Sequence, residues 1–165
     1  MSADLEPRID ALGARQLVGV RTRMSGARDR TAELWRRFMP RRREVTHAVG
    51  DALYSVEVYE PGYFDPYDPG AELEKWAAVE VAGDGVVPEG MEGLTLPGGL
   101  HAVFVHRGPA SEAMRTYRYI HERWLPGSGY RLADRPHFAI MGEKYRGEDP
   151  ASEEEIWIPI EPAGP

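Results

Sequence analysis

Hydrophobic and polar positions in the first half of the chain predict three strands and one helix. The segments QLVGVRTRM (16–24), ALYSVEVYEPG (52–62) and KWAAVEV (75–81) are apolar or alternate with a period of two, which is typical of strands. The segment DRTAELWRRFMP (29–40) instead has its apolar residues at helical spacing, with Asp29 as a candidate N-cap and a proline at its end. The predicted order is strand, helix, strand, strand.

The second half of the chain repeats this order. GLHAVFVHRG (99–108) predicts a strand, and SEAMRTYRYIHERWLP (111–126) predicts a helix with Ser111 as the candidate N-cap. HFAIMGEKY (137–145) and EEEIWIPIEP (153–162) predict the two remaining strands of this half.

The two similar halves predict an α+β fold built by duplication of a β-α-β-β unit. The repeats span about residues 14–82 and 100–161, and the Gly- and Pro-rich stretch 83–99 is expected to link them. Helices are too few for a doubly wound parallel sheet. One unit alone covers its sheet poorly, so we expect residues 1–165 to form a single domain. That domain has an antiparallel sheet, two main helices and two pseudo-symmetric halves.

One carboxylate interrupts an otherwise apolar strand. Side chains alternate between the two faces of a strand, so Trp76 and Glu80 share one face of segment 75–81. An ionised carboxylate is rarely buried without a partner, because its desolvation is costly. Either this face is wet, or a positive group meets Glu80. That group is an organic cation, which the tryptophan would also attract, or an arginine of this chain.

Composition and charge restrict the class of protein. A chain of 165 residues with 42% hydrophobic and 28% charged residues is typical of one globular domain. Its net charge of −7 argues against nucleic acid as a direct partner. No apolar run approaches the roughly 18 residues of a membrane span, so no membrane partner is expected. The N-terminus lacks a signal-peptide pattern, which predicts a cytoplasmic location.

Common catalytic and metal-binding motifs are missing from the sequence. The chain has no cysteine, and its five histidines lack a metal-binding spacing. No G-x-S-x-G, phosphate-binding or dinucleotide-binding motif is present. We therefore expect neither a metal nor a cofactor.

The chain resembles the GyrI-like small-molecule-binding family over about residues 12–161. The resemblance rests on LWRRFMP (34–40), YSVEVY (54–59) and KWAAVEV in the first half, and on the stretch 99–145 followed by EEEIWIPI in the second. This family includes the effector-binding domains of AraC-type and MerR-type regulators, and stand-alone members. Only about a dozen residues precede the first predicted strand, so a stand-alone member without a DNA-binding domain is expected.

The resemblance implies a ligand pocket between the two halves, lined by aromatic and acidic residues. Some relatives bind amphipathic cations, others hydrolyse cyclopropane-bearing DNA-alkylating natural products, and one inhibits DNA gyrase as a protein. We therefore expect first a protein that senses or sequesters amphipathic, often cationic or aromatic small molecules. A hydrolase is the alternative, and a role with a protein partner comes third.

One position departs from the resemblance. Similar sequences read HFEI where this chain reads HFAI, so Ala139 replaces an acidic pocket residue. This favours binding over catalysis and leaves Glu80, taken as the matching position of the first half, as the principal carboxylate and the only candidate catalytic residue. Aromatic candidates are also suited to a core, and Met141 is suited to an adaptable pocket. The candidate ligand-binding residues are Glu80, Trp76, Tyr59, Phe104, Tyr117, Ala139, Met141 and Trp157.

Overall fold

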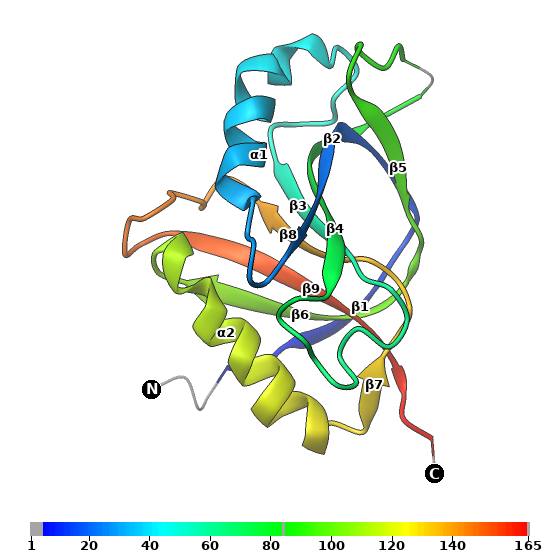
Figure 1. Ribbon diagram of the computed structural model, residues 1–165, viewed down its shortest axis with the longest axis vertical. Coiled ribbons are helices and arrows are strands. Elements are labelled where there is room, and N and C mark those ends of the chain that lie inside the picture. Colours follow the sequence, from blue (N-terminus) through cyan, green and yellow to red (C-terminus); the bar gives the residue numbers. More distant parts are fainter. Residues whose placement is uncertain (1–4, 84, 165) are drawn as a thin grey trace.

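The computed structural model describes residues 5–83 and 85–164, which form an α+β fold with one antiparallel sheet and two main helices (Figure 1). The strands are β1 (Arg8–Leu12), β2 (Arg15–Ser25), β3 (Leu53–Val58), β4 (Glu72–Val81), β5 (Glu92–Leu96), β6 (Gly99–Arg107), β7 (Tyr130–Leu132), β8 (His137–Met141) and β9 (Glu153–Pro162). The helices are α1 (Thr31–Phe38), which continues as the 3-10 segment η1 (Met39–Glu44), and α2 (Ala113–Tyr119).

The order of strands in the sheet reflects the two halves. The strands lie in the order β1-β6-β9-β8-β3-β4-β2-β5, and β7 pairs with β9. The first half contributes β2-α1-β3-β4 and the second contributes β6-α2-β8-β9, so the same order of elements occurs twice. The halves meet where β3 pairs with β8 in the middle of the sheet. The predicted α+β class, antiparallel sheet and two helices are confirmed, whereas the exact bounds of the repeats stay a prediction.

Two strands lie outside the predicted units. The stretch 83–99, expected to be a linker, contains β5, which pairs with β2. The leucines of β5 do alternate with other residues, but the surrounding glycines and prolines hide this short pattern. The strand β1 near the N-terminus is also absent from the prediction, and it pairs with β6. The stretch between the two units thus contains a strand of the sheet, while its role as a linker stays a prediction.

These two extra strands close the sheet on itself. Strand β1 leads into β2 after a two-residue bend, and β5 leads into β6 in the same way. The pairings on both sides of the bends keep one register, with Leu12 opposite Gly99 and Arg15 opposite Leu96. At the bend, a Cβ on Gly98 would lie 2.8 Å from the carbonyl oxygen of Leu12. The two bent segments can therefore approach this closely only because residue 98 is a glycine. The result is a barrel-like sheet with two seams between the halves, one at β3–β8 and one along these bent strands.

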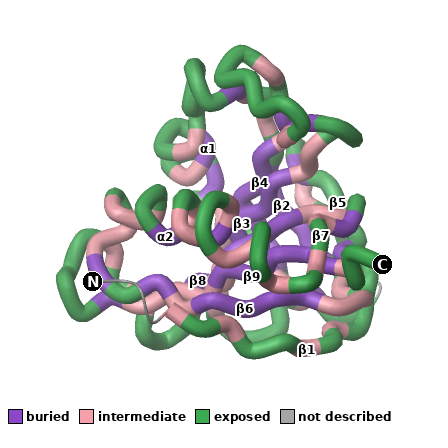
Figure 2. The backbone as a smooth tube through the Cα atoms, turned by 90° about the horizontal axis from the view of Figure 1, so that it is seen from below, coloured by how far each residue is buried: buried purple, intermediate pink, exposed green. Residues whose placement is uncertain are grey.

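The closed sheet has one face inside and one face under the helices. The inside is filled by a buried cluster from both halves, consisting of Leu17, Tyr54, Val56, Trp76, Ala78, Leu96, Val103, Phe138 and Trp157. Outside, α1 packs through Leu34 and Phe38 on the first half, and the segment after α2 packs through Ile120 on the second. Figure 2 shows the resulting distribution, with buried strands in the centre and exposed loops around them.

Both predicted helix starts differ from the structure. The N-cap position of α1 is Arg30, although the adjacent Asp29 still accepts a hydrogen bond of 2.9 Å from the backbone N–H of Thr31. Ser111 lies in a 3-10 turn before α2, and its hydroxyl donates to Glu148 instead of capping the helix. Beyond Tyr119 the α-helix gives way to a π-helical segment, Ile120–Trp124, and the 3-10 turn Leu125–Gly127.

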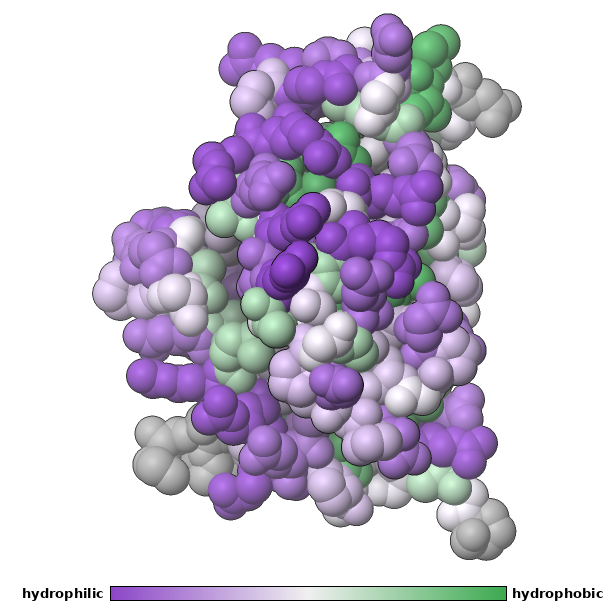
Figure 3. Space-filling view, in the orientation of Figure 1, coloured by the Kyte–Doolittle hydropathy of each residue, from purple (hydrophilic) through white to green (hydrophobic). Residues whose placement is uncertain are grey.

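The outer surface is mainly polar on the face seen in Figure 3, where apolar residues form separate small patches. Among the described residues, no helix combines the length and the apolar character that crossing a membrane requires. The cytoplasmic location stays a prediction.

Candidate functional site between the two halves

The candidate residues chosen from the sequence lie on two opposite faces of the sheet. Trp76 and Trp157 belong to the cluster that fills the barrel, and Glu80 shares their face. Ala139 lies opposite Ser55, on the outer face that the helices cover, because its neighbour Phe138 points inside. The other candidates on the outer side are Tyr59, Phe104, Tyr117 and Met141. Of these eight candidates, Tyr59 lines the pocket that is described below.

Glu80 has an internal partner. Its Oε1 accepts a hydrogen bond of 3.3 Å from the hydroxyl of Tyr54 and lies 3.8 Å from Nη1 of Arg15. Nη1 of Arg15 in turn donates to the Tyr54 hydroxyl at 2.5 Å. Of the two positive partners that the sequence left open for Glu80, the structure therefore shows the arginine of this chain.

Glu80 and Ala139 do not lie in corresponding strands of the two halves. Strands β3 and β8 are the third elements of their halves, and they pair with each other across the first seam. Glu57 in β3 and Ala139 in β8 both lie on the outer face, whereas Glu80 belongs to β4 and points to the other face. The correspondence assumed from the sequence between Glu80 and Ala139 is wrong, because a strand pattern defines alternating faces without showing which strand corresponds to which.

A buried ion pair occupies this outer face near the first seam. Glu57 lies directly opposite Lys75 of β4, and Nζ of Lys75 donates to Oε2 of Glu57. Only 10% of the Glu57 side chain and 9% of the Lys75 side chain are exposed. Glu154 of β9 lies on the same face, and burial raises the pKa of its carboxyl, while His106 and Lys75 act in the opposite direction.

Aromatic rings from both halves gather beside this ion pair. The ring of Tyr59 lies 4.7 Å from that of Phe64 and 4.8 Å from that of His137, measured between centroids. Phe64 stacks on His121 of the π-helical segment, with centroids 5.0 Å apart. Tyr63 joins the cluster at 4.5 Å from Tyr59. The cluster therefore bridges the loop after β3 and two elements of the second half.

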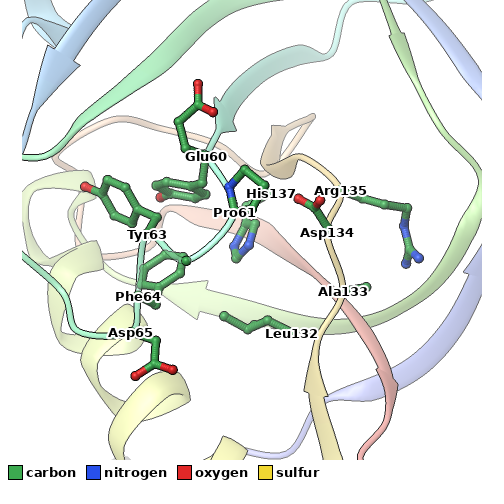
Figure 4. A pocket seen from close by; sticks show the side chains of 12 residues that line it. Glu60, Pro61, Tyr63, Phe64, Asp65, Leu132, Ala133, Asp134, Arg135 and His137 are labelled. Atoms are coloured by element: carbon green, nitrogen blue, oxygen red, sulfur yellow. The ribbon is translucent and has the colours of Figure 1, made fainter.

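A pocket of about 290 Å³ lies against this aromatic cluster. One wall is the loop after β3, residues 59–65, and the other is formed by residues 132–135 and His137. Figure 4 shows His137 between Pro61 of one wall and Asp134 of the other, while the side chains of Glu60, Asp65 and Arg135 extend away from His137. Each wall comes from a different half of the chain, as expected for a pocket between the halves.

Charge is unevenly distributed around this pocket. Its lining includes the three exposed carboxylates of Glu60, Asp65 and Asp134, but one guanidinium, that of Arg135. Deeper in, burial raises the pKa of Tyr59 well above its ordinary value, and the carboxylate of Glu57 adds to this rise. The Tyr59 hydroxyl is therefore neutral, and it offers both a hydrogen-bond donor and an acceptor.

His137 makes stability depend on pH. Burial and the nearby imidazoles of His121 and His101 lower the pKa of His137 from 6.5 to about 3. The unfolded chain binds this proton at about pH 6.5, whereas the folded chain does not, so stability falls as pH decreases from about 6.5 towards 3. The slope from this one group is at most about 1.4 kcal/mol per pH unit.

We expect His137→Phe to reduce the loss of stability between pH 6.5 and 5, a range in which few carboxylates titrate. Urea unfolding followed by tryptophan fluorescence at closely spaced pH values measures the slope. His47→Gln serves as the control, because His47 lies outside the aromatic cluster, and it should keep the slope of the unmodified protein. An unchanged slope in His137→Phe would contradict the assignment.

Comparison with known proteins defines the class of this fold and site. The model of the GyrI-like small molecule binding domain matches residues 5–161, and the chain belongs to this family. The transcriptional regulator BrlR of Pseudomonas aeruginosa is 28% identical over 159 residues, which are 95% of this chain but 56% of BrlR. This chain therefore spans little more than half the length of that regulator.

Two solved structures have the same fold. SAV2435, solved bound to tetraphenylphosphonium, superposes with a TM-score of 0.71 at 16% identity, covering 95% of this chain and 94% of SAV2435. A hydrolase from Listeria innocua has a TM-score of 0.60 at 14% identity, covering 94% of this chain and 92% of the hydrolase. At these identities the similarity concerns the fold alone.

Several residues of the site were missed from the sequence. Glu57 and Lys75 are not among the candidates from the sequence, although both stand in segments that the alternating pattern predicts as strands. The segment YFDPYDPG (63–70) has the composition of a turn and supplies none of the candidates, yet its Tyr63 and Phe64 line the pocket. Its density of aromatic residues was the available signal. For the wall around Asp134, no sequence signal was present.

Proposed function

We propose that the protein binds aromatic, amphipathic small molecules in the pocket between residues 59–65 and residues 132–137. The observation that carries this proposal is the aromatic cluster, to which both halves contribute and against which the pocket lies. Small-molecule sites are mostly apolar and aromatic, with a few polar groups that fix the orientation of the ligand. Here the polar groups are the hydroxyl of Tyr59 and the charged side chains at the mouth.

The charged residues at the mouth of the pocket favour a ligand that carries a positive group. Three carboxylates and one guanidinium line the pocket, so a cation at the mouth is attracted, more strongly at low ionic strength. The rings of Tyr63 and Phe64 add cation–π attraction for such a group. SAV2435, which has the same fold, was solved bound to tetraphenylphosphonium, whose aromatic rings support the aromatic part of this proposal.

We expect Phe64→Ala to weaken binding of an aromatic amine by roughly tenfold or more, because Phe64 contributes a ring face to the pocket and truncated aromatic anchors dominate losses of affinity. Dansylcadaverine is a suitable probe, because it joins a neutral naphthalene ring to an aliphatic amine and its fluorescence reports burial. The measurement is a fluorescence titration at low and at physiological salt.

Two controls define this experiment. Phe64→Leu keeps apolar volume without the ring and should lose less affinity than Phe64→Ala. Met114→Ala changes an exposed residue of α2 outside the pocket and should bind as the unmodified protein does. Equal affinities for Phe64→Ala and Met114→Ala would contradict the proposed site.

The proposal is for binding without turnover. A hydrolase needs a base that is free to accept a proton from water. Of the acidic positions within the sheet, Glu57 is paired with Lys75 and Glu80 with Arg15, and Ala139 offers no carboxylate, so a base could come only from the exposed carboxylates at the mouth. The role with a protein partner stays a prediction from the resemblance.

A further inference from the structure

We propose that Lys75 acts as a resident counter-ion that makes the inner wall of the pocket neutral. The pocket then accepts an uncharged aromatic group at its inner end and keeps the ligand's positive group at the mouth. This inference rests on the proposed binding function, and it names the residue that sets the charge of the ligand. Lys75 is a specificity-determining residue that acts through Glu57, without contact to the ligand.

The ion pair lies directly behind the pocket wall. Glu57 is the register partner of His137, which lines the pocket, and it is also the register partner of Lys75 on the other side. Tyr59, on the same outer face two residues beyond Glu57, lines the pocket as well. A charge on Glu57 is therefore adjacent to the side chains of His137 and Tyr59, which both line the pocket.

A ligand cannot easily take the place of Lys75. The ammonium is held opposite Glu57 by strand pairing, so its effective concentration at the carboxylate is high. Displacing it would also leave an unpaired ammonium in a buried place, which is strongly unfavourable. A cation in the pocket consequently meets a neutral ion pair at its inner end instead of a free carboxylate.

The neighbouring residues agree with a neutral inner end. Ala139, on this outer face, is uncharged, and burial raises the pKa of the Glu154 carboxyl on the same face. Ser55, opposite Ala139, is also uncharged. The carboxylates that line the pocket itself are those of Glu60, Asp65 and Asp134, and in Figure 4 the Asp134 carboxylate lies on the side facing Pro61. The fitting ligand is a flat neutral ring system with a peripheral amine, rather than a cation whose charge is enclosed by its rings.

Three probes of different charge test this inference by isothermal titration calorimetry. Tetraphenylphosphonium and tetraphenylborate have the same shape and opposite charge, and dansylamide is neutral. Lys75→Met exposes the pocket to an unpaired carboxylate, so its affinity for tetraphenylphosphonium should rise roughly tenfold or more, while that for dansylamide changes less than about threefold. Glu57→Gln leaves an unpaired ammonium and should raise the affinity for tetraphenylborate by a similar factor.

The double variant Lys75→Met/Glu57→Gln is the control, because it removes both charges. Its preference among the three probes should return to that of the unmodified protein. If the two single variants fail to shift tetraphenylphosphonium and tetraphenylborate in opposite directions, while dansylamide still binds, the role of Lys75 is refuted and the binding function stands. If neither dansylamide nor dansylcadaverine binds to any variant, the proposed function fails, and the inference fails with it.

Discussion

A fragment of residues 1–97 will not fold on its own, and addition of a fragment of residues 98–165 will restore the native structure. The interior cluster is shared between the halves, since Val103, Phe138 and Trp157 come from the second half and the other members from the first. Without the second half, β3 loses its partner β8 and β1 loses its partner β6. The isolated fragment would therefore expose both an apolar sheet face and unpaired strand edges.

The measurement is the dispersion of amide signals in a two-dimensional NMR spectrum of each fragment and of their mixture. We expect narrow dispersion for each fragment alone and native-like dispersion for the mixture. This result would establish that the two repeats form one domain, which the sequence predicts. A well-dispersed spectrum from residues 1–97 alone would contradict the prediction.

Lys75→Met alone should lower the free energy of unfolding by about 3–5 kcal/mol, because it leaves the carboxylate of Glu57 buried without a partner. The double variant Lys75→Met/Glu57→Gln should recover most of this loss, since an uncharged pair of similar volume is well tolerated in a core. Urea unfolding at pH 7, followed by far-ultraviolet circular dichroism, gives both values.

The matched control is Arg23→Met, which breaks the ion pair between Arg23 and Glu72 on the exposed part of the same sheet. Exposed ion pairs contribute little to stability, so this variant should unfold almost as the unmodified protein does. Similar losses for Lys75→Met and Arg23→Met would show that the pair of Lys75 and Glu57 is not buried in solution.

The two similar halves could be predicted from the sequence because their strands and helices are long enough for the alternating or helical pattern to be recognised beside irregular loops. The short strands β1 and β5 were missed, because five residues beside glycine and proline give too little periodicity. Their role depends on strand pairing between residues some ninety positions apart, such as Leu12 with Gly99, and local sequence contains no sign of it.

The site was predicted in part, and the errors have a common cause. Alternation correctly grouped Trp76 with Glu80, but it could not tell that this face fills the barrel and that the helices cover the other face. Tyr59 lines the proposed pocket, whereas Tyr117, Ala139 and Met141 lie on the same outer face but outside its lining. The ion pair of Glu57 and Lys75 depends on strand register, which becomes visible only in three dimensions.

The second seam of the sheet also bears on how such a chain can arise. Strand β1 precedes the first half but pairs with β6 of the second, and β5 precedes the second half but pairs with β2 of the first. One unit together with its leading strand could therefore pair with an identical copy of itself. Two copies of such a unit would exchange their leading strands around a twofold axis and close the same sheet as a homodimer. Fusion of the two copies into one gene makes the association independent of concentration. It also lets the two copies diverge in sequence, so that the paired strands β3 and β8 need not be alike.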